Sequence, residues 1–171
     1  MLRFADIQHA PPGTLASLLS RAYEPLLCSN PGRWRPEEEA WEAFDREAYS
    51  SGHVGRCVFL SLLGDVLVGF GSFDPRGIPA TARVGHHCIL PPYQGRGFGR
   101  AQLAEILRRL EIRGAQAVVA TTLDIPFFMP AQHAYRSAGF RLAGRTPWEA
   151  DPRIVRLHFQ REPRPDQPMS A

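Results

Sequence analysis

The chain has 171 residues, of which 44% are hydrophobic and 22% charged, a composition typical of one ordinary globular domain. It contains neither a charged leader followed by an apolar stretch nor a long apolar run, so we expect no secretion signal, no membrane span and a cytoplasmic location. The net charge of +3 suits an anionic ligand, but the arginines are scattered and no basic stripe interleaved with aromatics predicts nucleic-acid binding. The three cysteines are widely spaced and match neither a disulfide framework nor a zinc site.

The N-terminal third predicts one strand and two helices. Alternating apolar and polar residues predict a strand over residues 2–7, and apolar residues at helical spacing predict a helix over 15–22. After a break at 29–32, Pro36 and the three glutamates that follow it open a second helix. Its inner face is expected to carry Trp41, Phe44 and Ala48.

The remaining chain predicts six strands and two helices. Strands are expected over residues 56–63, 66–73, 82–90, 117–123, 140–145 and 154–160. Helices are expected over residues 100–113 and 131–138, each followed by a glycine. We therefore expect one domain over residues 1–161, followed by a proline-rich tail, 162–171, that is disordered.

A glycine-rich turn, Gln94-Gly95-Arg96-Gly97-Phe98-Gly99-Arg100, lies where a strand has ended and a helix is about to begin. Unpaired backbone N–H groups converge there with the positive end of the helix dipole, which favours an anion. The glycines let the main chain approach a phosphate group, and Arg96 and Arg100 add charge-assisted hydrogen bonds. The alternative is a plain tight turn between a strand and a helix.

Two familiar phosphate-binding motifs do not fit this turn. A P-loop requires a lysine, and the chain contains none. A dinucleotide fingerprint reads G-x-G-x-x-G early in a βαβ unit, whereas the spacing here is G-x-G-x-G in mid-chain.

At this turn the sequence resembles the GNAT superfamily of N-acetyltransferases, whose cofactor motif Q/R-x-x-G-x-G/A is matched by Gln94, Gly97 and Gly99. The preceding run, residues 89–93, is similar to the family's V-x-P-x-Y strand end, and residues 135–140 are similar to its Y-x-x-x-G-F segment. The resemblance covers residues 82–140, and the order of elements outside this range also agrees with the family.

The resemblance implies an α/β (α+β) fold: a central mixed, mostly antiparallel sheet of about seven strands, flanked by about four helices and splayed at the cofactor site. Acetyl-CoA would lie in the gap as co-substrate, with no metal. Backbone groups of Cys88, Ile89 and Leu90 would bond to its acetyl and pantetheine amides, and the N–H groups of Arg96 to Arg100 would hold its pyrophosphate. The other implied partner is an amine acceptor, and dimers are common in the superfamily, which makes a homodimer an open alternative to a monomer.

The resemblance also suggests catalytic residues. Tyr135 occupies the position of the family's usual general acid; its alternative role is a core tyrosine. Where several relatives carry a glutamate as base, this chain has Arg83. His86 and His87 lie on the same strand and titrate near neutral pH, and as strand neighbours they point to opposite faces, so we expect at most one to face the acceptor.

Other residues near the predicted site have weaker indications. Asp124 is a third candidate base, or it caps the loop before a proline. His86 and Cys88 share a strand face, but no further ligand is evident, so we reject a metal site. Phe128 stands where many relatives place an asparagine near the pantetheine.

The resemblance implies that the first two helices and their loop select the acceptor. Aromatic and acidic residues there would form a site suited to an ammonium group: Trp34, Trp41, Glu38 and Glu42. A core role for the tryptophan at 41 and a solvated helix face for the two glutamates are the alternatives. The predicted function is an acetyl-CoA-dependent N-acetyltransferase that acts on a primary amine of a small molecule or protein by direct attack. An acyl-CoA-binding sensor without turnover is the alternative.

Overall fold

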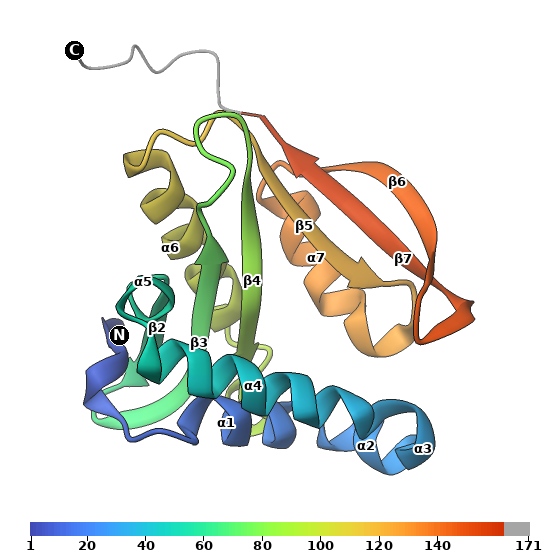
Figure 1. Cartoon of the computed structure of the whole chain (residues 1–171), viewed down its shortest axis with the longest axis horizontal. Helices are drawn as coiled ribbons and strands as arrows, with labels where there is room; N and C mark the ends of the chain where they lie inside the picture. The colour runs from blue at the N-terminus through green and yellow to red at the C-terminus, as the bar shows by residue number, and fades with distance from the viewer. Residues whose placement is uncertain (163–171) are drawn as a thin grey trace.

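The computed structural model describes residues 1–162, and its strands form one open seven-stranded sheet in the order β1-β2-β3-β4-β5-β7-β6 (Figure 1). The strands are β1 (Leu2–Asp6), β2 (Val58–Leu63), β3 (Val66–Asp74), β4 (Ala82–Ile89), β5 (Val118–Leu123), β6 (Arg141–Trp148) and β7 (Asp151–Arg161). Neighbouring strands run antiparallel except for β4 and β5, which are parallel. This confirms the predicted mixed sheet. The predicted tail, apart from Glu162, lies outside the described residues.

The helices are α1 (Thr14–Ala22), α2 (Glu24–Ser29), α3 (Pro31–Trp34), α4 (Pro36–Ser50), α5 (Gly52–Gly55), α6 (Phe98–Ile112) and α7 (Met129–Ser137), with short 3-10 turns at Ile7–His9, Pro91–Tyr93 and Pro126–Phe128. The break expected at 29–32 is narrower than predicted. Of residues 29–32 only Asn30 lies outside a helix, because its side chain caps α3 by accepting from the Arg33 N–H at 3.2 Å while Pro31 starts the next turn. Within residues 1–162, no helix is long and apolar enough to cross a membrane.

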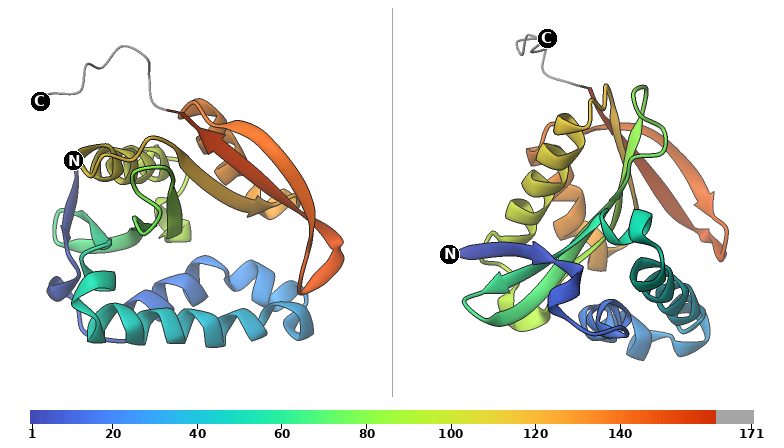
Figure 2. Two further views of the ribbon diagram at one scale, coloured as in Figure 1. Left: turned by 45° about the horizontal axis from the view of Figure 1, so that its top comes forward. Right: turned by 60° about the vertical axis from the view of Figure 1, so that its left-hand side comes forward.

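The sheet separates two hydrophobic cores. Helices α1 to α4 cover one face and α6 and α7 cover the other, as the views in Figure 2 show. Strand β2 serves both cores by alternation: Val58 and Leu60 pack under the N-terminal helices, whereas Phe59 packs on the opposite side.

Strand β4 contains a β-bulge. In its register with β3, Ser72 alone lies opposite two residues, Gly85 and His86, and the Ser72 hydroxyl donates to the His86 carbonyl at 2.7 Å. The extra residue shifts the alternation of side chains along the strand. Val84 therefore packs in the core beneath α6, whereas Cys88 packs in the core beneath the N-terminal helices.

Strands β4 and β5 pair only where both begin, at Ala82 with Val118 and Arg83 with Val119. Strand β5 stays paired with β7 over its whole length. The edge of β4 beyond Arg83 is consequently left open, which confirms the predicted splay of the sheet.

Asp45 joins the two longest N-terminal helices. Its buried carboxylate, on α4, accepts from the N–H groups of Gly13 at 2.6 Å, Leu15 at 2.7 Å and Ala16 at 3.2 Å at the start of α1. This contact satisfies backbone donors that a helix start leaves unpaired, and it fixes α1 against α4.

Replacing Asp45 with alanine should lower the free energy of unfolding by about 2–4 kcal/mol, because it leaves these N–H groups without their acceptor. Urea denaturation measures this change. Glu42→Ala on the same helix is the matched control, since Glu42 makes only an exposed pair with Arg46 at 3.8 Å, and its effect should stay within about 0.5 kcal/mol. Equal losses in both variants would contradict the capping role.

Candidate active site

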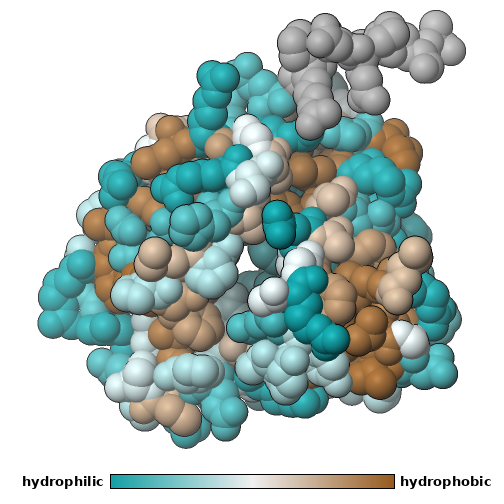
Figure 3. Space-filling view, turned by 180° about the vertical axis from the view of Figure 1, so that it is seen from behind, coloured by the Kyte–Doolittle hydropathy of each residue, from teal (hydrophilic) through white to brown (hydrophobic). Residues whose placement is uncertain are grey.

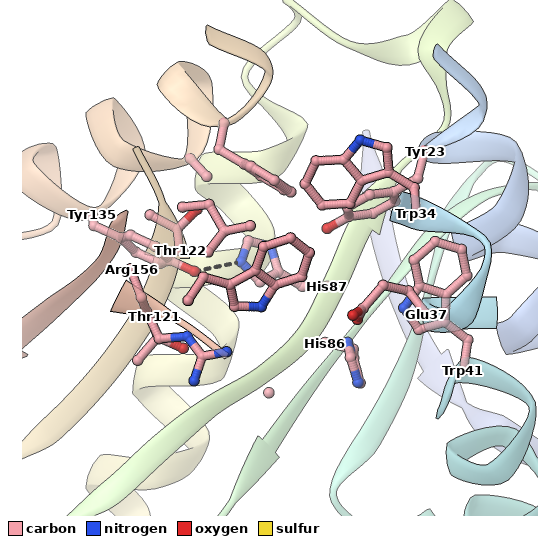
Figure 4. Close-up of a pocket in the computed structure, with 15 residues that line it drawn as sticks. Tyr23, Trp34, Glu37, Trp41, His86, His87, Thr121, Thr122, Tyr135 and Arg156 are labelled. Atoms are coloured by element: carbon pink, nitrogen blue, oxygen red, sulfur yellow. Dashed lines mark hydrogen bonds between the residues drawn. The ribbon is translucent and has the colours of Figure 1, made fainter. Parts of the chain in front are cut away.

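A cavity of about 240 Å³ lies between the open edge of β4, strand β5 and the N-terminal helices (Figure 4). Its walls are formed by Tyr23, Trp34, Glu37, Trp41, Gly85, His86, His87, Thr121, Thr122, Leu123, Phe128, Ala131, Tyr135, Trp148 and Arg156. The space-filling view from behind also shows the molecule hollowed near its centre (Figure 3). The lining residues thus come from the N-terminal helices, from strands β4 to β7 and from α7 with the turn that precedes it.

Tyr135 and His87 meet at the back of this cavity. The His87 Nε2 and the Tyr135 hydroxyl lie 3.0 Å apart, one from β4 and the other from α7. Burial raises the pKa of the Tyr135 phenol above its ordinary value, whereas burial, together with the neighbouring His86, lowers the pKa of His87 to about 4. At neutral pH both groups are therefore uncharged.

His86 projects to the other face of the sheet, where its ring packs against Phe44 of α4 with centroids 5.0 Å apart. The two histidines thus point to opposite faces, as expected, and both nevertheless line the cavity. The reason is the splay: the cavity passes through the sheet beside the unpaired edge of β4 and reaches both faces. His86 stays open to solvent, yet the surrounding protein removes part of its hydration and lowers its pKa.

Asp124 lies outside the cavity. Its side chain is 42% exposed and its Oδ2 accepts from Arg145 at 2.9 Å. The loop that follows β5 turns this carboxylate toward β6, away from the residues that line the cavity. The structure therefore does not bring Asp124 together with the histidines.

The glycine-rich turn is open in the way that an anion would need. Gly97 precedes α6 with a φ of 81°, and a Cβ at Gly95, Gly97 or Gly99 would meet no atom within 4 Å. The first bond of the helix runs from the Ala101 N–H to the Gly97 carbonyl, and within residues 1–162 no side chain caps this end. The N–H groups of the first turn are left for a ligand.

The end of β4 offers fewer free backbone groups than expected. The Leu90 N–H donates to the Val68 carbonyl at 2.8 Å, and the Cys88 carbonyl accepts from the buried Gln102 amide at 3.0 Å. Backbone groups alternate in direction along a strand, so those of Ile89, which lies between Cys88 and Leu90, point away from β3. The Ile89 carbonyl accepts from the Gln94 side chain at 2.8 Å. Of the three residues, Ile89 thus presents its main chain to the open edge.

The side of the cavity where we expect the acceptor is aromatic. Trp34 stacks on Trp148 with ring centroids 5.0 Å apart and planes 20° apart, and Tyr23 packs at 5.2 Å from Trp41. Phe128, where relatives carry an asparagine, contacts Tyr23 with centroids 5.7 Å apart.

The acidic residue of this wall is Glu37 rather than Glu38 or Glu42. Glu38 accepts from Ser20 at 3.4 Å, and Glu42 pairs with Arg46 at 3.8 Å, outside the cavity. A sequence signal for Glu37 existed, because Trp34, Glu37 and Trp41 follow the helical spacing of three and four residues. Burial raises the pKa of the Glu37 carboxyl, and the charge of Arg156 opposes this rise.

Sequence reasoning missed Thr121, Thr122, Trp148 and Arg156, which come from β5, β6 and β7. They are far from the glycine-rich turn in sequence and belong to no motif, so only the pairing of the strands brings them to the cavity. Among residues 1–162, no three His, Cys, Asp or Glu side chains group as metal ligands would.

The fold is shared with several solved structures. A protein assigned to the GNAT family from Desulfovibrio desulfuricans is 20% identical, with a TM-score of 0.72 over 95% of this chain and 99% of its own. PH1933 from Pyrococcus horikoshii is 15% identical, with a TM-score of 0.72 over 96% and 99% of the two chains. The yncA protein from Salmonella typhimurium, solved with its cofactor acetyl-CoA, is 17% identical, with a TM-score of 0.66 over 100% and 98%.

At the level of sequence, a comparison with curated proteins finds no match. The sequence profile of the Acetyltransferase (GNAT) family matches residues 17–140, a range that runs from α1 to the end of the Y-x-x-x-G-F segment. It includes the splayed strands, the glycine-rich turn and Tyr135. The chain therefore belongs to the GNAT family of acetyltransferases.

Proposed function

We propose that this acetyltransferase moves the acetyl group of acetyl-CoA to a primary amine, of a small molecule or a protein, by direct attack of the amine. The observation that carries the proposal is the convergence of three features at the open edge of β4: an uncapped helix start, the outward-facing backbone of Ile89 and the Tyr135 hydroxyl. These three features would respectively bind the phosphates, align the thioester and protonate the leaving group.

The turn from Gln94 to Arg100 fits a pyrophosphate. A Cβ at any of its three glycines would meet no atom within 4 Å, the helix start has no side-chain cap, and the Arg96 and Arg100 side chains of the turn are exposed. The Ile89 main chain is the group on β4 that would align the pantetheine arm and the acetyl carbonyl. The coenzyme supplies the activated acetyl group, and Tyr135, His87 and His86 hold or move protons around it.

Tyr135 is suited to protonate the thiolate of coenzyme A as it departs. Burial keeps its phenol protonated at neutral pH, so a proton is available at the hydroxyl. His87 is neutral at the same pH. In the tautomer that carries its proton on Nε2, it donates a hydrogen bond to the Tyr135 oxygen across 3.0 Å. The phenol proton is then free to move to the sulfur. His87 thus acts through Tyr135 as a positioning residue.

His86 is the base that we propose for the amine. It lines the acceptor side of the cavity, whereas His87 is engaged with Tyr135 and Asp124 with Arg145. Its lowered pKa leaves the imidazole neutral at pH 7, and a neutral imidazole can accept the amine proton directly or through one water.

Thiol release from acetyl-CoA in the presence of an amine panel tests the function. Release that depends on an amine supports transfer. The second candidate function, an acyl-CoA-binding sensor, is favoured by Arg83 at the position of the usual glutamate and by Phe128 at that of the asparagine. Binding of acetyl-CoA without release beyond hydrolysis would favour the sensor.

Replacing Gly97 with valine should weaken acetyl-CoA binding by at least about 10-fold, because a branched side chain at this φ distorts the turn and blocks approach to its N–H groups. Calorimetry gives the affinity. Gly114→Val is the matched control: it has a φ of 80° and equally open surroundings at the other end of α6. If both variants bind acetyl-CoA alike, the turn does not hold the phosphates.

Tyr135→Phe should lower turnover by about 10²–10⁴-fold while acetyl-CoA affinity stays nearly unchanged. The phenylalanine ring retains the packing of the tyrosine against Phe140 and Phe159, each with centroids 5.5 Å away. Tyr49→Phe, which removes a hydroxyl 3.5 Å from the Ile7 carbonyl outside the cavity, should leave turnover unchanged. A folded Tyr135→Phe enzyme with the wild-type chemical rate would make Tyr135 a packing residue.

His86→Asn should remove the acidic limb from the pH profile of kcat/KM. In the wild type the rate should rise with pH as His86 loses its proton. The pKa of His86 is lowered from its ordinary value because the surrounding protein removes part of the hydration of the charged form, so this rise should come at a lower pH than for a free histidine. His53→Asn, which changes an exposed histidine beside Arg56, should leave the profile as it is. An unchanged profile in His86→Asn would leave Glu37 as the stronger candidate for the base.

A further inference from the structure

The cavity contains one carboxylate and one guanidinium, set among aromatic rings. Figure 4 shows Glu37 projecting from α4 and Arg156 from β7 on opposite sides of the same space. The rings of Tyr23, Trp34 and Trp148 fill much of the wall between them. A ligand that spans this cavity therefore meets a negative group, apolar surface and a positive group.

We propose that the acceptor is a small amine that also carries a carboxylate on an apolar body, as a free amino acid does, with Glu37 facing its ammonium group and Arg156 binding its carboxylate. This inference rests on the proposed function and narrows its substrate class. A lysine side chain or a protein N-terminus brings an amine but no adjacent carboxylate, so neither would use Arg156.

Arg156 has hydrogen-bonding capacity to spare. Its two terminal nitrogens bond to Glu149 at 2.9 and 2.6 Å, but Glu149 is 73% exposed, whereas Arg156 is 29% exposed. An exposed partner contributes little and is readily exchanged. A guanidinium has five N–H donors in a planar fork, so it can bind a second carboxylate within the cavity.

Glu37 is placed to receive a cation. Among residues 1–162 it has no hydrogen-bond or ion-pair partner, although it is partly buried between Trp34 and Trp41 on consecutive helical turns. Burying a carboxylate without a partner is costly, and an ammonium group offsets that cost.

The volume also favours a small acceptor. At about 240 Å³ the cavity is below the roughly 300–1,000 Å³ typical of sites for drug-sized ligands. An amino acid with an apolar side chain would present that side chain to the stacked Trp34 and Trp148.

The test compares acceptors that differ only in the carboxylate: phenylalanine with phenylethylamine, tryptophan with tryptamine, and leucine with isopentylamine. Thiol release from acetyl-CoA should show kcat/KM at least about 10-fold higher for the amino acid of one or more pairs, as expected for a charge-assisted contact. Arg156→Gln should lower kcat/KM for that amino acid by about 10–100-fold and change the value for its decarboxylated partner by less than about two-fold.

Three further variants separate binding from structure. Arg156→Lys should recover part of the preference, since it keeps the charge but not the fork. Glu149→Gln should retain the preference for the amino acid over the decarboxylated amine, because it changes only the exposed partner of Arg156. If Glu149→Gln instead loses this preference to the same extent as Arg156→Gln, then the effect of Arg156 depends on Glu149. Arg141→Gln, an exposed arginine on β6 outside the cavity, is the matched control.

Two negative results are distinguishable. Amine-dependent release that is equal within every pair, or a loss in Arg156→Gln that is equal for both members, would overturn this inference and leave the acetyltransferase function in place. Binding of acetyl-CoA with no release for any amine would overturn the proposed function, and this inference with it.

Discussion

The separation of β4 from β5 is the constraint on which the rest of the site depends. The two strands pair at only two positions, and then β5 follows β7 while β4 stays with β3. An unpaired strand edge inside a protein needs hydrogen-bond partners, and here the Gln94 side chain supplies one to Ile89. The remaining backbone groups of this edge are what an extended, amide-containing coenzyme arm can bind.

The same separation explains why residues from both faces of the sheet meet in one cavity. His86 belongs to the face that packs on α4, and His87 to the face that packs on α7. In a closed sheet, a layer of backbone would divide them. The bulge opposite Ser72 adds a second effect, because it sets which of the two histidines joins Tyr135 and which faces the aromatic wall.

The electrostatics of the cavity follow from its partial burial. Tyr135 and His87 are uncharged because ionising either would cost solvation, so this pair moves or holds protons without a net charge. The charged groups, Glu37 and Arg156, lie on the acceptor side, where the wall is made of aromatic rings. In the function proposed above, proton transfer to the leaving group and recognition of the acceptor therefore take place at different walls of the cavity.

Local signals in the sequence determined the strands, the helices α1, α4, α6 and α7 and the glycine-rich turn, because periodicity, glycine spacing and a strand-to-helix junction are properties of neighbouring residues. The role expected of Tyr135 came from the resemblance of residues 135–140 to the family. The sequence also led us to expect Trp34 and Trp41 at the acceptor site, and both line the cavity. The choice of Glu37 over Glu38 and Glu42 depended on how α4 is rotated against the sheet, which Asp45 and the core decide. The pairing of β5, β6 and β7 brings Trp148 and Arg156 to the cavity, and the ion pair with Arg145 holds Asp124 outside it. The sequence could not predict these positions, because contacts between distant segments leave no pattern along the chain.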